Sequence, residues 1–284
     1  MEPSRATYAE NRIETAFTHR PSIVQDIFNF EHFALAYQLG TRSTLAAYYT
    51  YVDYGYVADL PDHSYNYTLG ATYAAQINQE LSAGLTLKRV SQELLQSTAH
   101  SLAVDLGVLY QWQDFLRAQA CQSQMNFGVS LSNLGQKAEF FEGQADPLPQ
   151  FLRVGLASNL KSSATWAETG LSRAGVLISF EYQKLLNDEE KIWEWGTGIE
   201  AQFLEMMHFR LGYHKRFPQI NRTAIGKTFE TGATYGFGFD IPFHEVFKIA
   251  APLTFQFDFA SAPQGGWVER YEMFTFAMGF GSRP

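Results

Sequence analysis

The stretch YNYTLGATYAAQINQELSAGLTLK, residues 65–88, alternates between two kinds of side chain. Over residues 65–76, the odd-numbered positions are mostly large and apolar: Tyr65, Tyr67, Leu69, Ala71, Tyr73 and Ala75. The even-numbered positions are mostly small or polar: Asn66, Thr68, Gly70, Thr72 and Gln76. After the short turn at 77–79, residues 81–88 repeat the pattern, with leucines and an alanine opposite Ser, Gly, Thr and Lys. A period of two predicts a pair of antiparallel strands joined by a tight turn.

The same period of two recurs along the whole chain, with little helical periodicity, and therefore predicts an all-β protein. The alternation and the turn residues divide the chain into about fourteen predicted strands. Their expected spans are 12–19, 31–39, 43–54, 64–76, 80–92, 99–112, 124–134, 150–160, 174–184, 192–204, 206–216, 228–240, 251–260 and 271–280.

Alternating strands suit either a soluble β-sandwich or a barrel in a membrane, and two features favour the barrel. The predicted strands run to about ten residues or more, longer than the usual 5–6 and suited to crossing a bilayer at a tilt. The face opposite the apolar one is rich in Gly, Ala, Ser and Thr, whereas a soluble surface would carry many charges. Charged residues make up only 18% of the chain, while aromatic residues make up 15%. The sequence therefore predicts one domain over residues 1–284, an antiparallel transmembrane β-barrel of outer-membrane type.

Composition and motifs argue against several other classes of function. The formal net charge of −8 disfavours a nucleic-acid partner, which would need clustered Lys and Arg. The single Cys121 allows no internal disulfide, and no Cys/His spacing suggests a metal site. His208 and His214 share one strand face but lie about 20 Å apart at strand spacing, too far for one ion. No catalytic motif is recognisable, so we expect no enzyme activity and no cofactor.

The connections predict the orientation of the barrel. Very short turns follow even-numbered strands, at 40–42, at 77–79 and near Glu205, and connections after odd-numbered strands are mostly longer. Short periplasmic turns and longer outer loops are typical of outer-membrane barrels, so both termini are expected on the periplasmic side. Aromatic residues at predicted outer strand ends suit the lipid headgroup layer. They are Tyr48, Tyr49, Tyr51, Tyr54, Tyr56, Trp193 and Trp195.

Two sets of residues are candidates for function. The first is a set of charges predicted to face the lumen: Lys88, Asp105, Arg153, Glu181, Glu194, Glu200, Arg210, Glu230 and Asp258. They are expected to pair and fill the lumen; the alternative is a path for an ion or ligand. The second is the acidic, aromatic and Pro-stiffened connection after the seventh strand. It contains Glu139, Phe140, Phe141, Glu142, Asp146, Pro147, Leu148 and Pro149.

That outer connection is expected to be preorganised, because each Pro restricts the residue before it and cannot join a ladder. Exposed aromatic residues on a rigid loop can grip a protein partner at low entropic cost. The alternative is that Phe140 and Phe141 merely continue a strand into the headgroup layer.

Several segments resemble the PorV/PorQ group of outer-membrane barrels, relatives of the FadL transporters. They are SLAVDLGVLYQ, NFGVSLSNLGQKAEF, DPLPQFLRVGLAS, LAAYYTYVDYGYV and LSAGLTLKRVSQEL, and they cover most of residues 15–160. The resemblance implies a fourteen-stranded barrel in the outer membrane of a Gram-negative, Bacteroidota-like bacterium, associated with the type IX secretion system. The implied partners are C-terminal signal domains of secreted cargo, translocon and attachment-complex subunits, and outer-membrane lipid, but no nucleic acid.

The chain departs from the family pattern at its start. Members of the group begin with a signal peptide and a plug-like segment ending in an NPAG-like turn, and this sequence is expected to begin beyond both. Two alternative functions stay open from the sequence. One is a FadL-like passive transporter of hydrophobic small molecules, and the other is a structural accessory barrel.

Overall fold

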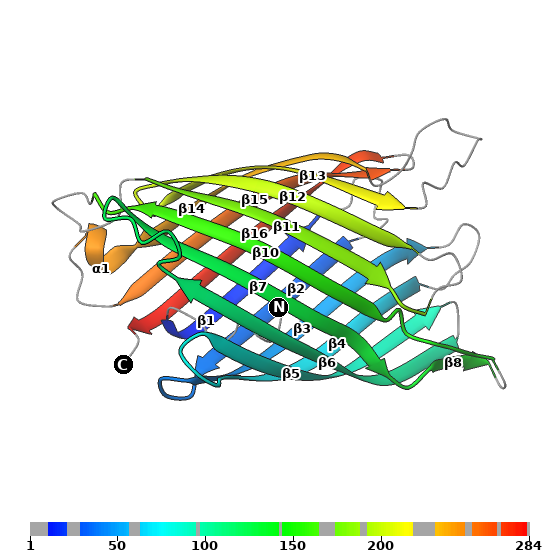
Figure 1. Cartoon of the computed structure of the whole chain (residues 1–284). Helices are drawn as coiled ribbons and strands as arrows, with labels where there is room; N and C mark the ends of the chain where they lie inside the picture. The colour runs from blue at the N-terminus through cyan, green and yellow to red at the C-terminus, as the bar shows by residue number, and fades with distance from the viewer. Residues whose placement is uncertain are drawn as a thin grey trace.

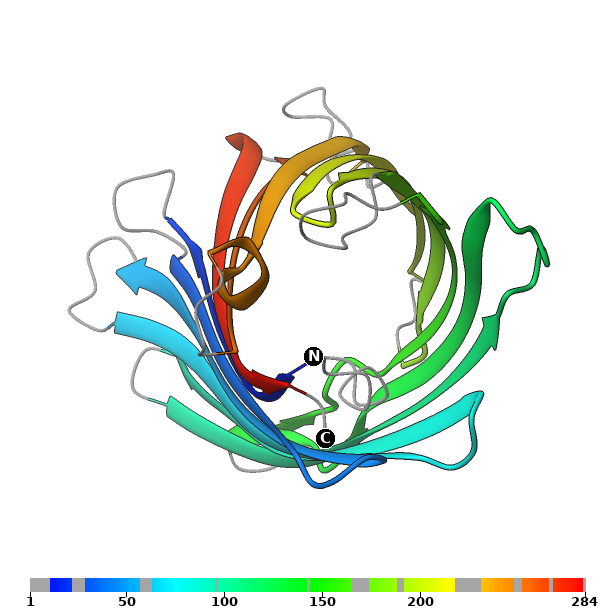
Figure 2. The same cartoon turned by 90° about the vertical axis from the view of Figure 1, so that its left-hand side faces the viewer.

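The computed structural model describes residues 11–21, 29–56, 63–94, 97–141, 144–164, 174–187, 192–217, 231–247, 252–265 and 268–282. Fourteen antiparallel strands form one closed barrel, as Figures 1 and 2 show from the side and along the axis. Each strand pairs with its neighbours in sequence, and the first strand closes on the last, from Asn11 opposite Ser282 to His19 opposite Phe274. The predicted fold class is confirmed.

The barrel strands are β1 (Asn11–Arg20), β2 (Asn29–Gln38), β3 (Ser43–Tyr56), β4 (His63–Gln76), β5 (Leu81–Leu94), β6 (Ser97–Gln113), β7 (Cys121–Gly135), β10 (Phe151–Ser162), β11 (Ala174–Leu185), β12 (Trp193–Phe203), β13 (Met207–Phe217), β14 (Gly232–Pro242), β15 (Leu253–Gly265) and β16 (Val268–Ser282). Two short strands, β8 (Ala138–Phe141) and β9 (Gln144–Asp146), pair only with each other and form what we call the rim hairpin. One helical turn, α1 (Phe243–Val246), follows β14. Among the described residues no helix is long and apolar enough to cross a membrane.

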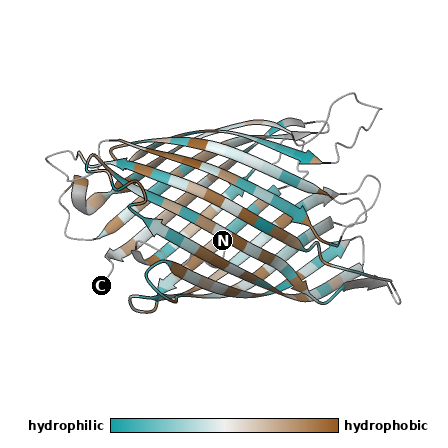
Figure 3. Cartoon of the chain, in the orientation of Figure 1, coloured by the Kyte–Doolittle hydropathy of each residue, from teal (hydrophilic) through white to brown (hydrophobic). Residues whose placement is uncertain are grey.

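The alternation in sequence places apolar side chains outside and small ones inside. Leu69 and Leu85 on the outer face are 50% and 47% exposed, whereas Ala74 and Ser82 on the inner face are fully buried. Figure 3 shows this as brown and pale or teal residues alternating along the strands. An apolar outer face in contact with lipid and a closed ladder without free edges satisfy the two requirements of a membrane-spanning sheet.

The two ends of the barrel differ. The rim hairpin lies at the right-hand end in Figure 1, which we call the hairpin end; the turns at 39–42 and 77–80 and helix α1 lie at the opposite turn end. By the predicted orientation the hairpin end is the outer one. Connections at the turn end are not uniformly short, since residues 163–173 and 243–252 join strands there, with α1 in the second.

Some strands are longer than predicted at the hairpin end. The spans expected at 80–92 and 99–112 become β5 and β6, with only two residues between them. Pairs such as Gln92 with Ala99 and Glu93 with Thr98 continue the ladder. Backbone pairing does not depend on the polarity of the side chains, so the ladder continues where the apolar alternation of the sequence has ended, although Ala99 on the inner face is still buried. The start of the span predicted at 228–240 lies outside the described residues.

The expectation that the tyrosine cluster of β3 faces the headgroups is wrong for two of its members. Tyr54 accepts a hydrogen bond from the inward-facing Asn66, with 2.6 Å between its hydroxyl and Nδ2. Tyr48 is also inward, because a Cβ placed on Gly70 of the inner face would lie 2.2 Å from the Tyr48 ring. Strand alternation explains both, since even-numbered residues of β3 face the lumen. Tyr49 and Tyr51 face outward, and the side chain of Tyr56 lies outside the described residues.

Candidate functional site

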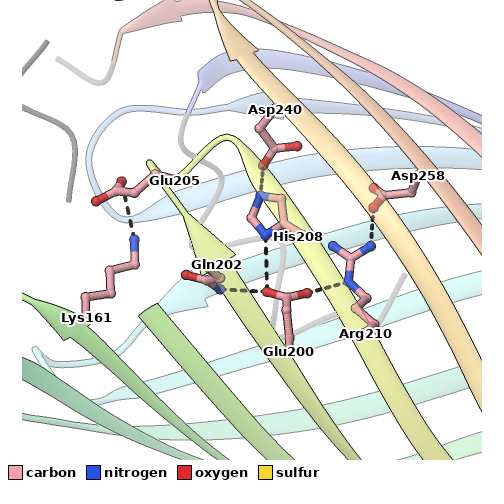
Figure 4. Close-up of polar contacts among 8 residues, drawn as sticks. All are labelled: Lys161, Glu200, Gln202, Glu205, His208, Arg210, Asp240 and Asp258. Carbon is pink, nitrogen blue, oxygen red and sulfur yellow. Dashed lines mark hydrogen bonds and ion pairs between the residues drawn. The ribbon is translucent and has the colours of Figure 1, made fainter. Parts of the chain in front are cut away.

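A polar network, drawn in Figure 4, connects neighbouring strands β12–β15 along the inner face of the barrel near the turn end. Glu200 of β12 lies at its centre, because the tight turn at 204–206 brings β13 back beside β12 and pairs Glu200 with Arg210 in register. Gln202 Nε2 donates to Glu200 Oε1 at 2.6 Å, and His208 Nδ1 lies 3.3 Å from the same oxygen. The other Glu200 oxygen accepts from Arg210 Nε.

Arg210 and His208 extend this network to the next two strands. Arg210 Nη1 donates to Asp258 of β15, while His208 Nε2 lies 3.2 Å from Asp240 of β14. The side chains of Glu200 and His208 are only 13% and 10% exposed. A shielded carboxylate without partners is costly, so an arrangement of β12 and β13 that broke the three contacts to Glu200 would be disfavoured. The contacts therefore hold this part of the barrel wall in one arrangement.

Other predicted lumen charges meet in two further groups in the described part of the barrel. Toward the hairpin end, Arg153 Nε donates to Gln183, whose Nε2 donates to Glu194 Oε1 at 2.6 Å. Across the barrel, Lys88 Nζ lies 2.6 Å from Asp105 Oδ2, and these two side chains are 10% and 15% exposed. Glu181 lines a cavity described below, and Glu230 lies outside the described residues. Predicted lumen charges of opposite sign therefore meet in separate groups rather than in one continuous path.

A cavity of about 840 Å³ lies within the barrel, mainly against the inner wall of β11–β15. Its wall includes Gly196, Gly198, Gly212 and Gly236, where the backbone itself borders the space. Polar residues border it as well: Gln111, Gln124, Asn126, Glu181, Glu200, Arg210 and His214. By contrast, many positions on the inner faces of β2–β6 carry small, buried side chains, such as Ala34 at 3% and Thr86 at 1% exposure. The open space is thus concentrated on one side of the lumen.

Among the residues that the structure describes, the connection after β7 is the most elaborate feature of the hairpin end. Past the rim hairpin, the chain returns through Asp146, Pro147, Leu148 and Pro149, of which the aspartate and both prolines are exposed. Asn187 Nδ2 donates to Leu148 O and Asn133 Nδ2 to Pro149 O, each at 2.6 Å. One asparagine of β7 and one just after β11 therefore hold the proline segment, which fixes the base of the hairpin.

The other predicted partner-binding residues are described only by their backbone or not at all. The backbone of Glu139, Phe140 and Phe141 forms β8, which pairs with β9. Their side chains, and residue Glu142 as a whole, lie outside what the structure describes. Whether the two phenylalanines are exposed therefore stays a prediction.

Sequence reasoning missed several members of these groups. Asp240 alternates with outward Phe239, and this parity could have placed it inside; His208 was considered only for a metal site. Asn133 and Asn187 gave no periodic signal, because their roles depend on a bend and a turn. In the described ranges, no group of three or more His, Cys, Asp or Glu side chains could hold a metal ion.

No protein-family model and no curated protein sequence matches the chain. Solved structures do resemble it. The toluene transporter TodX of Pseudomonas putida is 11% identical, with 98% of this chain and 91% of TodX covered and a TM-score of 0.50. A FadL homologue of Pseudomonas aeruginosa is 8% identical, with 98% and 92% covered and a TM-score of 0.47.

The β-domain of the Bordetella autotransporter BrkA is 10% identical, with 96% of this chain and 99% of that domain covered and a TM-score of 0.42. At these identities a likeness concerns the fold alone. TodX and this chain share a barrel architecture, and the chain has the fold of an outer-membrane β-barrel.

Proposed function

We propose that the protein is a non-enzymatic adaptor barrel of the outer membrane, associated with type IX secretion, that binds C-terminal signal domains of secreted cargo. It passes this cargo from the translocon to the attachment complex. The proposal rests on the sequence resemblance to the PorV/PorQ group and on one structural observation. That observation is the anchored rim hairpin, which is separate from the barrel sheet.

The anchoring supports a binding role for energetic reasons. A loop that must be ordered on binding loses affinity, whereas a segment already held in place does not carry that cost. Asn133 and Asn187 hold the return segment through its carbonyl groups, and Pro147 and Pro149 restrict its backbone. Exposed Asp146 and the two prolines then lie at a fixed edge of the barrel mouth.

The proposal predicts that Phe140→Ser combined with Phe141→Ser leaves the barrel folded but weakens cargo capture. The matched control is Phe115→Ser with Leu116→Ser, which removes apolar side chains at the turn end, where Leu116 is 50% exposed. Capture of a purified cargo signal domain by detergent-solubilised barrel measures the effect. We expect a loss of at least ten-fold for the first variant and no change for the control. Equal capture by the wild-type and the Phe140/Phe141 variant would contradict the role of the hairpin.

The lumen cavity favours a second candidate, a FadL-like passive transporter of hydrophobic small molecules. A space of about 840 Å³ could hold a small ligand. TodX, whose fold this chain shares, is a toluene transporter. Calorimetric titration of the solubilised barrel with toluene tests this candidate.

The matched variants are Gly196→Leu, which would fill the cavity wall, and Gly155→Leu, at an inward position outside the cavity lining. A Cβ at either position meets no atom closer than 3.7 Å. Binding that is lost only in Gly196→Leu would support transport. Absence of toluene binding by the wild-type barrel would contradict this candidate.

A further inference from the structure

An irregularity in the barrel wall lies directly below the rim hairpin. In the ladder between β6 and β7, Val104 pairs with Leu134 and Leu106 pairs with Leu131. Between these pairs β6 has one residue, Asp105, whereas β7 has two, 132 and 133. This is a β-bulge, which bends the strand that carries the extra residue. Asn133 takes the left-handed conformation, with φ of 62°, which Asn adopts more readily than most residues.

At the bulge the backbone N–H of Asn133 is directed to a side chain instead of the ladder, and the Asp105 carboxylate accepts its hydrogen bond. Asn133 N donates to Asp105 Oδ1 at 2.7 Å, while the other carboxylate oxygen lies 2.6 Å from Lys88 Nζ. One carboxylate therefore joins a lysine of β5 to the bent backbone of β7. Because both charged side chains are at most 15% exposed, water competes little for these contacts.

The bend also sets the path of the chain beyond it. Gly135 approaches β6 so closely that a Cβ there would lie 2.0 Å from Leu102 O. Gln136 N then donates to Leu102 O at 2.9 Å, and Ser101 Oγ donates to Gln136 O at 2.5 Å. β8 starts two residues later. The Asn133 side chain also holds the return segment by donating to Pro149 O. The segment that enters the rim hairpin and the segment that leaves it therefore both depend on the bulge.

We infer that Asp105 is the positioning residue of the rim hairpin, acting from inside the lumen with Lys88 as its partner. The carboxylate stabilises the left-handed bend, and the bend sets the path of the chain from β7 into β8. Through Asp105, the lumen charge pair and the orientation of the binding hairpin are one connected unit. The biological importance of this positioning rests on the proposed adaptor function, but the positioning itself does not.

Spin-label distances test the inference. With Cys121 replaced by Ser, labels are attached at Asp146 on the hairpin and at Lys184 on β11, both exposed. Removing a hydrogen bond to a charged group should raise the population of displaced hairpins about ten-fold or more. We therefore expect a narrow distance distribution in the wild-type protein and a broad one in Asp105→Ala. Asp105→Asn keeps an acceptor for the Asn133 N–H and is expected to retain the narrow distribution.

A distribution in Asp105→Ala that matches the wild-type would overturn the inference. If Asp105→Ala does not fold, the double variant Lys88→Met/Asp105→Ala provides the same test, because it removes the acceptor of the Asn133 N–H without leaving a shielded lysine unpaired. It is expected to broaden the distribution, and an unchanged width would overturn the inference. Cargo capture separates this inference from the adaptor proposal. A broadened distribution with unchanged capture would contradict the role of the rim hairpin in cargo binding while leaving the positioning role intact.

Discussion

Replacing Arg210 by Met should destabilise the barrel by about 3 kcal/mol. Arg210 donates to Glu200 and to Asp258, whose side chains are 13% and 34% exposed. A hydrogen bond to a charged group contributes about 1.5–3 kcal/mol. We count about 2 kcal/mol for the shielded Glu200 contact and about 1 kcal/mol for the more solvated Asp258 contact. The sum corresponds to a change of about 150-fold in the folding equilibrium.

A double-mutant cycle shows whether this network acts as a unit. Glu200→Gln alone should cost about 2 kcal/mol, because it weakens the contact with Arg210 and also that with His208. The double variant should cost about 3 kcal/mol rather than about 5 kcal/mol, since it leaves no shielded carboxylate without its cation. The expected coupling is therefore about 2 kcal/mol.

Urea unfolding in lipid vesicles, followed by the fluorescence of the five tryptophans, measures these free energies. Lys161→Met is the control, because its pair with Glu205 spans 3.4 Å and both side chains are about one-third exposed. That change should cost less than about 1 kcal/mol. Additivity of the Arg210 and Glu200 variants within about 0.5 kcal/mol would refute the reasoning.

Two further predictions follow from close contacts at glycines. Gly70→Ala should destabilise the barrel by about 1–3 kcal/mol in the same assay, because the new methyl group would displace the Tyr48 ring. Gly155→Ala, with no neighbour closer than 3.8 Å, should be near neutral, and equal costs would contradict the packing argument. Gly135→Ala should detach the base of the rim hairpin from Leu102, since a backbone oxygen cannot move aside as a flexible side chain can. Limited proteolysis should then cleave between β8 and β9 faster than in the wild-type; an unchanged cleavage rate would contradict this account of Gly135.

The barrel itself was predictable because lipid and lumen impose opposite preferences on successive residues. Leu69 and Gly70, or Phe237 and Gly238, differ in character because one faces lipid and the other faces a crowded interior. Strand number follows from this period and from the turns. Strand ends were predicted less well, since the ladder of β5 and β6 continues to Leu94 and Ser97, where large apolar residues no longer alternate with small ones in the sequence.

The site was predictable only at the level of composition. Parity placed Glu200, Arg210 and Asp258 inside, but their mutual contacts depend on the stagger between strands, which the sequence does not encode locally. The bulge at Asn133 is a one-residue insertion that interrupts a regular pattern, and it became visible only when β6 and β7 were seen in register. Tyr48 was misplaced because an aromatic cluster was considered without its alternation.

The adaptor proposal is tested most directly by purifying the tagged protein from outer membranes in mild detergent and identifying what is recovered with it. The account predicts secreted proteins that share a β-sandwich C-terminal domain, together with a large translocon barrel. Both should be lost from the Phe140→Ser/Phe141→Ser variant and kept by the Phe115→Ser/Leu116→Ser control. Recovery of the barrel alone, carrying lipid or a hydrophobic small molecule, would contradict the adaptor role and favour transport through the lumen.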